Sequence, residues 1–168
     1  MHRISGGTKK WLLTLHLLFS AIMLGVTVAF LILSLVAAST SDEGVLKACY
    51  ASMLLLAETS IRASTIGAVV TGVLLSLLTH WGLFKYYWII AKLLLTVASI
   101  GLGMAGIYMW SLKAAAITGA DGLNALGQSD FLVNRAFLIN GIIMQLLSLL
   151  ALFILSVFKP WGKRVPRK

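Results

Sequence analysis

Three side chains that could hold a cofactor lie inside or beside apolar stretches of the chain. His16 lies five residues into the first apolar run, His80 ends the second, and Lys92 lies four residues into the third. Imidazole is an iron ligand and a lysine ammonium pairs with a propionate, so these residues together predict a haem site in a helix bundle. Their spacing leaves open whether the three side chains touch one another.

Each of the three residues also has a simpler interpretation. Burying a histidine inside a span costs free energy unless a partner bonds its ring, so His16 is equally explained as a hydrogen-bonded structural residue. Lys92 is explained as a lysine that extends its ammonium to the headgroups while its stem stays among the acyl chains. His80 is explained as an ordinary interfacial residue.

A second polar set lies toward the other end of the apolar runs. Arg62 and Arg135 begin the membrane parts of the second and fourth helices, where each guanidinium either anchors the helix or binds an anionic headgroup or substrate. Asn140 and Gln145 follow on the fourth helix and are expected to be buried. Together the four residues predict a small transporter. Such a transporter needs an oligomer, because four helices without a proline-broken span leave little room for alternating access.

Several other kinds of site are excluded by the sequence. Met23 lies about two turns of helix from His16, and no paired histidines or Cys-His cluster accompanies them, so no metal site is predicted. Cys49 is the only cysteine and has no partner for a disulfide. The carboxylates lie near or beyond one membrane surface, which argues against a Ser-His-Asp set. No glycine-rich phosphate loop follows a strand.

The elements that position these residues follow from composition. Of 168 residues, 60% are hydrophobic and 11% are charged, which is too little polar surface to cover a soluble protein of this size. Lipid is therefore the expected solvent, and each helical crossing of a core about 30 Å thick needs about 20 apolar residues. The formal net charge of +9 is interpreted through membrane topology, and no nucleic-acid partner is expected.

The chain is predicted to be an all-α membrane protein, a single four-transmembrane-helix bundle over residues 1–168. The expected helices are 11–37, 45–80 with its membrane part at 62–80, 88–112 and 131–158. The glycine-rich residues 119–130 are expected to form a loop. Ser129 or Asp130 is expected to cap the last helix.

The charges predict the orientation of this bundle. Basic residues are concentrated at one end: Arg3, Lys9, Lys10, Lys85, Lys159, Lys163, Arg164, Arg167 and Lys168. All five acidic residues lie toward the other end: Asp42, Glu43, Glu58, Asp121 and Asp130. Basic loops stay in the cytoplasm, so both termini are predicted to be cytoplasmic. His16, His80 and Lys92 then share the inner leaflet.

Small residues spaced four apart predict where the helices approach one another in lipid. One such series is Ala21, Gly25 and Ala29 on the first helix, and another is Ala68, Gly72 and Ser76 on the second. Both series are expected to face the interior of the bundle. They indicate a bundle and not an activity.

Parts of the first three helices resemble known membrane proteins. His16 and Gly25 belong to the segment LHLLFSAIMLG, and Trp88 and Lys92 belong to the segment WIIAKLLL. With the stretch TGVLLSLLTHWGLFKYYWIIAK, these segments are similar to a pattern of uncharacterised bacterial four-helix integral membrane proteins. More distantly, a first-helix histidine and a third-helix Trp-x-x-x-Lys resemble the copper-resistance D-type membrane domain and the membrane protoporphyrinogen oxidase of the haem pathway.

In that oxidase family, the corresponding histidine and lysine are associated with haem binding and activity. The resemblance therefore implies that His16 is a haem ligand and that Lys92 is its companion. The chain has Met23-Leu24 where a tryptophan usually precedes the glycine of the first helix, and its outer loops lack the methionines and histidines expected for copper. These departures argue against copper handling. The resemblance to bacterial proteins implies a multi-pass protein of the cell membrane.

The sequence leaves three functions open. The first is an accessory or interaction module that binds a membrane protein partner. The second is a haem-b-binding redox protein that uses His16, and the third is the small oligomeric transporter. Whether the chain is an enzyme stays undecided. The expected partners are the lipid bilayer and either a membrane protein or a second copy of the chain.

Overall fold

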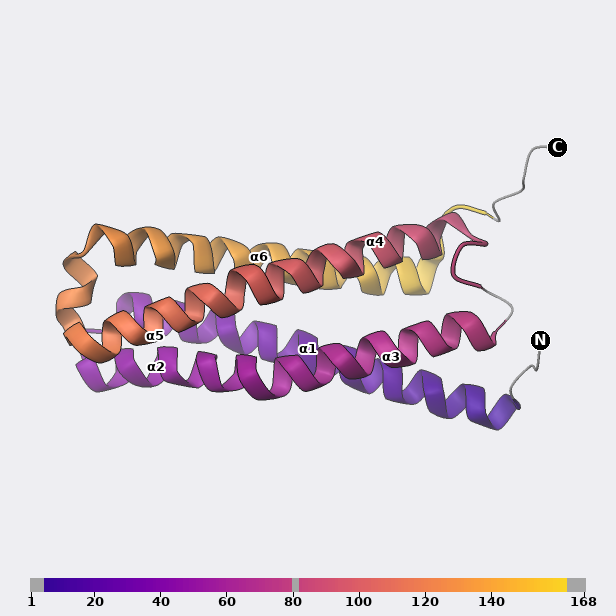
Figure 1. Ribbon diagram of the computed structural model, residues 1–168, viewed down its shortest axis with the longest axis horizontal. Coiled ribbons are helices and arrows are strands. Elements are labelled where there is room, and N and C mark those ends of the chain that lie inside the picture. The colour runs from indigo at the N-terminus through magenta and orange to yellow at the C-terminus, as the bar shows by residue number, and fades with distance from the viewer. Residues whose placement is uncertain (1–4, 80–81, 163–168) are drawn as a thin grey trace.

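The structure, a computed structural model, describes residues 5–79 and 82–162, and every regular element among them is helical. The elements in chain order are α1 (Gly6–Ser39), α2 (Glu43–Leu56), η1 (Ala57–Ile61), α3 (Arg62–Leu78), α4 (Tyr87–Gly101), η2 (Leu102–Tyr108), α5 (Met109–Asp121), η3 (Gly122–Gly127) and α6 (Ser129–Phe158). They form an elongated bundle in which α2 continues through η1 into α3 and α4 continues through η2 into α5 (Figure 1). The prediction of an all-α chain is confirmed.

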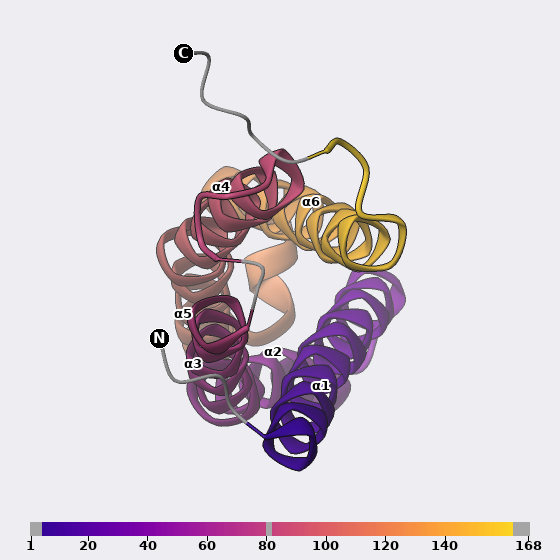
Figure 2. The same ribbon diagram turned by 90° about the vertical axis from the view of Figure 1, so that its right-hand side faces the viewer.

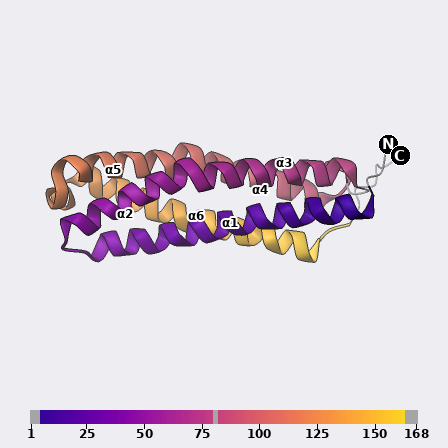
Figure 3. The same ribbon diagram turned by 90° about the horizontal axis from the view of Figure 1, so that it is seen from below.

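The described helices have the length and composition that a membrane requires. Four stretches are long and apolar enough to cross one, as predicted: Gly6–Ser39, Glu43–Leu78, Tyr87–Gly127 and Ser129–Phe158. The first has 34 residues and is therefore about 50 Å long, against about 30 Å for the hydrocarbon core. A helix of this length would either tilt in such a core or extend beyond it. The first helix begins and the last helix ends at the same end of the bundle (Figure 3).

The third helical stretch is longer than the sequence predicts. Its end was expected near residue 112, with a loop at 119–130, but α5 continues to Asp121 and η3 to Gly127. Gly119 remains helical, because a single glycine weakens a helix without necessarily ending it. The chain turns at Gly122, whose φ of +54° suits glycine, and the Glu43 carboxylate lies against it.

The helix starts differ in how they are capped. Ser5 Oγ accepts from the Thr8 amide at 3.2 Å at the start of α1, and Asp42 Oδ1 accepts from the Val45 amide at 3.0 Å at the start of α2. These bonds satisfy amides that a helix start leaves unpaired. The last helix follows Gln128 without a side-chain cap, contrary to the expected cap from its first residues.

One half of the bundle has a continuous core. This packed half comprises residues 30–57 and 107–142. Its buried cluster is Phe30, Ala37, Leu46, Cys49, Tyr50, Met53, Ala57, Ile107, Ala114, Ala125, Phe131, Leu138 and Ile142. The Tyr50 and Phe131 rings meet edge to face, with centroids 5.7 Å apart. Apolar contact across all four helical stretches therefore holds this half together.

The other half separates into two helix pairs. This open half comprises residues 6–29, 62–79, 82–106 and 143–158. Within it α1 packs on α3, and α4 packs on α6. The α1 and α3 helices lie together on one side and α4 and α6 on the other, and the two pairs diverge toward the end that bears the termini (Figures 1 and 2). Gly67 permits the first pair to close, since a Cβ there would lie 2.6 Å from the Phe19 ring.

The two series of small residues face different ways. Ala68, Gly72 and Ser76 face the interior of the open half, as expected. Ala21 and Gly25 are exposed, so the expectation for the first helix is wrong. The reason is that α1 turns its His16 face toward α3, and this places the small residues on the opposite, outward side.

The halves meet where two π-helical segments interrupt the helices. Residues 57–61 form η1 and residues 102–108 form η2. Tyr108 Oη donates to Glu58 Oε1 at 3.3 Å and links the two segments. Such π segments are rare and occur often at functional sites. The open half begins beside them.

Candidate functional site

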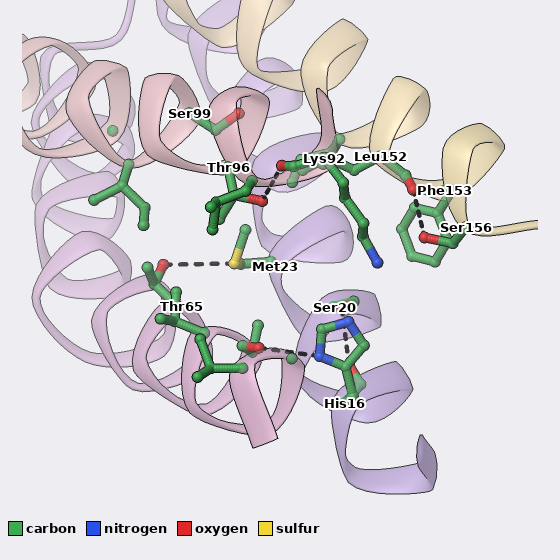
Figure 4. Close-up of a pocket in the computed structure, with 18 of the residues that line it drawn as sticks. His16, Ser20, Met23, Thr65, Lys92, Thr96, Ser99, Leu152, Phe153 and Ser156 are labelled. Atoms are coloured by element: carbon green, nitrogen blue, oxygen red, sulfur yellow. Dashed lines mark hydrogen bonds between the residues drawn. The ribbon is translucent and has the colours of Figure 1, made fainter. Parts of the chain in front are cut away.

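A cavity of about 940 Å³ lies between the two helix pairs of the open half. Its walls come from α1 and α3 on one side and from α4, η2 and α6 on the other. Side chains from both sides face it in Figure 4. Ligand pockets commonly enclose about 300–1,000 Å³ and combine apolar walls with a few polar groups. The cavity has the size and character of a ligand site.

His16 is fixed in the wall that α1 and α3 form. Its Nδ1 lies 3.0 Å from the Ala68 carbonyl oxygen and 3.1 Å from Thr71 Oγ1. Gly72 lets the ring lie close to the α3 backbone, since a Cβ at that position would lie 3.0 Å from His16 Cε1. The imidazole is therefore held from the next helix by its backbone as well as by a side chain.

These contacts decide which ring nitrogen carries the hydrogen. The Ala68 carbonyl can only accept, so Nδ1–H of His16 donates to it. Thr71 donates its own hydroxyl hydrogen to the Gly67 carbonyl at 2.6 Å, so its oxygen accepts from the same Nδ1–H. In the neutral ring, Nε2 then keeps a free lone pair. Figure 4 shows this second nitrogen on the side of the ring toward Lys92.

Lys92 reaches into the cavity from the opposite wall. It is on α4, it is half-buried, and its ammonium extends toward His16 (Figure 4). The charge of Lys92 acts electrostatically on the imidazole. In the part of the chain that the structure describes, the ammonium has no hydrogen bond or ion pair. The sequence left the proximity of these two residues open, and the structure brings both to one cavity.

The charges of the cavity all have one sign. Its described lining includes Lys9, Arg62, Lys92 and Lys159 but no aspartate or glutamate. In an apolar site of low dielectric constant, a cation without a described partner, such as the Lys92 ammonium, favours an anionic guest. The lining therefore favours a ligand that is mostly apolar and carries negative charge.

The remaining predicted site residues are dispersed. His80 lies outside the described residues. Arg62 is exposed and lines the cavity near the packed half, whereas Arg135 is not part of the lining and interacts electrostatically with Tyr50. The two arginines therefore do not form one anion site in the cavity.

The two amides of the last helix have opposite surroundings. Gln145 is 7% exposed and lines the cavity. Asn140 is exposed and donates to the Ala136 carbonyl of its own helix at 2.9 Å, so the expectation that it is buried is wrong. Asn134 and Gln145 are eleven residues apart and share a helix face, whereas Asn140 lies on another. The transporter residues thus do not line one pathway, and that function stays a prediction.

Sequence reasoning missed the groups that orient His16. The Ala68 carbonyl belongs to the backbone and has no sequence signal. Thr71 was not singled out, although a threonine inside an apolar run is a candidate for such a bond. Ser99, a further hydroxyl inside an apolar run, also lines the cavity and is 4% exposed.

No group of three or more histidine, cysteine or acidic side chains that could hold a metal ion exists among the described residues. Comparisons with protein-family models, with curated proteins and with solved structures find no match to the chain. The resemblance based on His16 and Lys92 therefore stays a prediction. The cavity and its polar groups are what bear on function.

Proposed function

We propose that the chain is a membrane protein that binds haem b in the cavity between the two helix pairs. The observation that carries this proposal is the hydrogen bond from His16 Nδ1 to the Ala68 carbonyl, which leaves Nε2 free to bind iron. Metal-binding histidines commonly donate their other ring hydrogen to a backbone carbonyl, because that bond fixes the tautomer and the ring orientation. His16 has this arrangement in the absence of any competing metal-binding cluster among the described residues.

The other groups of the cavity fit the same cofactor. A volume of about 940 Å³ is at the upper end of the usual range for ligand pockets. The Lys92 ammonium has no described partner and suits a propionate, since a charge-assisted hydrogen bond is stronger than a neutral one. Bound haem would supply one-electron chemistry at its iron.

Both helix pairs contribute residues to binding. His16 presents a lone pair from the wall of α1 and α3, and Lys92 presents a cation from α4. The apolar side chains that line the cavity would exclude water around a bound ligand and keep the dielectric constant low, which strengthens both interactions. A ligand held in this way would also join the two pairs across the cavity.

The proposal includes an orientation in the membrane. Lys9, Lys10, Lys85 and Lys159 lie at the end of the bundle where the pairs diverge, and the acidic residues other than Glu58 lie at the opposite end. The positive-inside rule then places both termini in the cytoplasm and the cavity toward the inner leaflet, in the plasma membrane of a bacterium. Binding of a partner protein, the interaction-module hypothesis, stays a prediction beside this one.

An absorption spectrum tests the proposal. The protein is purified in mild detergent from haem-replete cells, and spectra are recorded after oxidation and after reduction with dithionite. The expected result is a Soret band that sharpens and shifts on reduction in the wild type and is absent from His16→Ala.

Thr27→Val is the matched control for that variant. Thr27 also lines the cavity from α1, but its hydroxyl bonds only the Met23 carbonyl of its own helix, at 2.7 Å. It is expected to keep the wild-type spectrum. A wild type without a Soret band, or a His16→Ala variant that keeps it, would contradict the proposal.

A further inference from the structure

Two buried polar groups of the cavity have no hydrogen-bond partner among the residues that the structure describes. They are Ser99 Oγ on α4 and Gln145 Oε1 on α6. Ser99 is 4% exposed, Gln145 is 7% exposed, and both residues line the cavity. Leaving such groups unpaired in an apolar environment costs free energy, and lipid offers no water to compensate. Both oxygens are themselves buried, so a guest meets them only after rotation about the side-chain torsions of Ser99 and Gln145 turns them toward the cavity. A guest that then bonds to them would recover that cost.

These groups lie apart from His16 and Lys92. Ser99 is seven residues beyond Lys92, which corresponds to roughly 10 Å along α4. In Figure 4 it lies on the side of the cavity away from the Lys92 ammonium. Ser99 and Gln145 are both neutral, so these two groups suit an uncharged polar group. Arg62 also lines the cavity toward the packed half, but its side chain is exposed.

The cavity reaches the outer face of the bundle near this second polar end. Ile66 on α3 and Met104 on η2 both line the cavity, yet they are 60% and 69% exposed. Neither α4 nor η2 packs closely against α3, in contrast to the α1–α3 and α4–α6 contacts. Because this face is apolar and would contact lipid, a guest at Ser99 and Gln145 has a route from the bilayer between α3 and η2.

We propose that Ser99 and Gln145 form a second binding site, for a neutral lipid-soluble molecule with a hydroxyl head and an apolar tail. The hydroxyl donates to Gln145 Oε1, which can only accept, and Ser99 supplies a second hydrogen bond as donor or acceptor. The tail leaves between Ile66 and Met104 into the lipid. The site uses none of the residues assigned to haem, so it stands independently of that proposal.

A matched pair of probes tests recognition of the hydroxyl. The probes are p-nonylphenol and its methyl ether, p-nonylanisole, which differ in whether the head can donate a hydrogen bond. Haem-free protein in lipid nanodiscs is dialysed to equilibrium against each labelled probe, and uptake by empty nanodiscs is subtracted. The phenol is expected to bind about tenfold more tightly than the ether, as one buried hydrogen bond implies.

Variants locate the binding. Gln145→Leu is expected to remove the preference for the phenol, and Ser99→Ala to reduce it. Ser111→Ala is the matched control, because Ser111 Oγ is also buried without a partner but lies in the packed half, outside the cavity lining. It is expected to keep the preference.

The lateral route has its own test. Met104→Trp fills the proposed opening and is expected to slow association of the phenol several-fold. Val97→Trp is the control. Val97 is on α4, in the same helical stretch as Met104, and is 62% exposed, but it does not line the cavity. An unchanged association rate in Met104→Trp would overturn the route.

The remaining outcomes separate the two proposals. Equal binding of both probes, absence of binding, or an equal loss in Ser111→Ala would overturn the second site, and would indicate an acyl chain or water at this end of the cavity. None of these outcomes depends on the Soret band. A colourless protein that still prefers the phenol would overturn haem binding alone.

Discussion

In the packed half, Tyr50 and Phe131 are fully buried against each other, whereas in the open half Phe153 and Leu93 line a cavity. Both halves are built from the same four helical stretches, so the difference lies in the side chains between them. The packed half buries its apolar groups in one cluster across all four stretches. In the open half a cavity separates the two helix pairs. A bundle can therefore be stable at one end and keep room for a ligand at the other.

The glycines of the bundle differ in how closely other side chains approach them. Gly141 in the packed half and Gly106 at its border enclose the Trp110 ring, and a Cβ at these positions would lie 2.6 Å and 2.9 Å from it. Gly103 and Gly25 in the open half have no atom within 4 Å of where a Cβ would be. Glycine therefore serves close packing around Trp110 and within the α1–α3 pair, at Gly67, and leaves space at Gly103 and Gly25.

The largest expected effect comes from removing an aromatic ring from each half. Phe131→Ala is expected to lower the free energy of unfolding by about 3–5 kcal/mol, because it opens a void in a closed core. Phe153→Ala is expected to cost less than about 1.5 kcal/mol, because this half-buried ring already borders a cavity. Unfolding in detergent, followed by circular dichroism, measures both. Equal losses would mean that the halves are equally packed.

A smaller effect is expected from adding one methyl group. Gly141→Ala is expected to destabilise the protein by about 1–3 kcal/mol, since the new Cβ collides with Trp110. A Cβ at Gly103 would meet no other atom. Gly103→Ala is therefore expected to leave the free energy of unfolding unchanged or to raise it by up to about 1 kcal/mol, because alanine has the better helix propensity. Thermal unfolding of the two variants beside the wild type checks this. A destabilised Gly103→Ala would show that the open half is closed.

The orientation of His16 supplies a third test. Thr71→Val removes one of the two acceptors of Nδ1–H but keeps the Ala68 carbonyl, so haem affinity is expected to fall about tenfold. Thr96→Val is the control on the opposite wall, where the hydroxyl bonds only the Lys92 carbonyl at 2.8 Å. Haem titration followed at the Soret band gives both affinities. The same loss in each variant would argue against a specific role for Thr71.

The smallest effect is expected at the surface of the packed half. Lys113 Nζ lies 3.4 Å from Asp130 Oδ2, and both side chains are largely exposed. Lys113→Ala is expected to change the free energy of unfolding by less than about 0.5 kcal/mol, because solvent screens such pairs. The difference in unfolding between low and high salt should be equally small. A loss comparable to that in Phe131→Ala would mean that charges, and not the core, stabilise this half.

The sequence predicted the helices better than their faces. Long apolar runs are sufficient to predict four membrane-capable helices, because lipid requires that length and composition. The faces depend on neighbours that a single sequence does not reveal, so the outward position of Gly25 and the exposure of Asn140 were missed. The far end of the third stretch was missed because Gly119 resembles a loop residue but remains helical.

The candidate site was predicted only in part. His16 and Lys92 stand out, since ionisable side chains are rare in apolar runs. Their common cavity, the Ala68 carbonyl that fixes the tautomer and the unpaired Ser99 depend on how the pairs diverge. That divergence involves helices that are far apart in the sequence, and no local pattern records it.

The most direct test of haem ligation is chemical rescue of His16. His16→Gly removes the imidazole, and free imidazole can then occupy the space beside Ala68. The predicted result is a Soret band in the haem-loaded wild type, its loss or marked shift in His16→Gly, and its return when imidazole is added. A wild type that takes up no haem, or a His16→Gly spectrum that matches the wild type without imidazole, would contradict the assignment of His16 as the iron ligand.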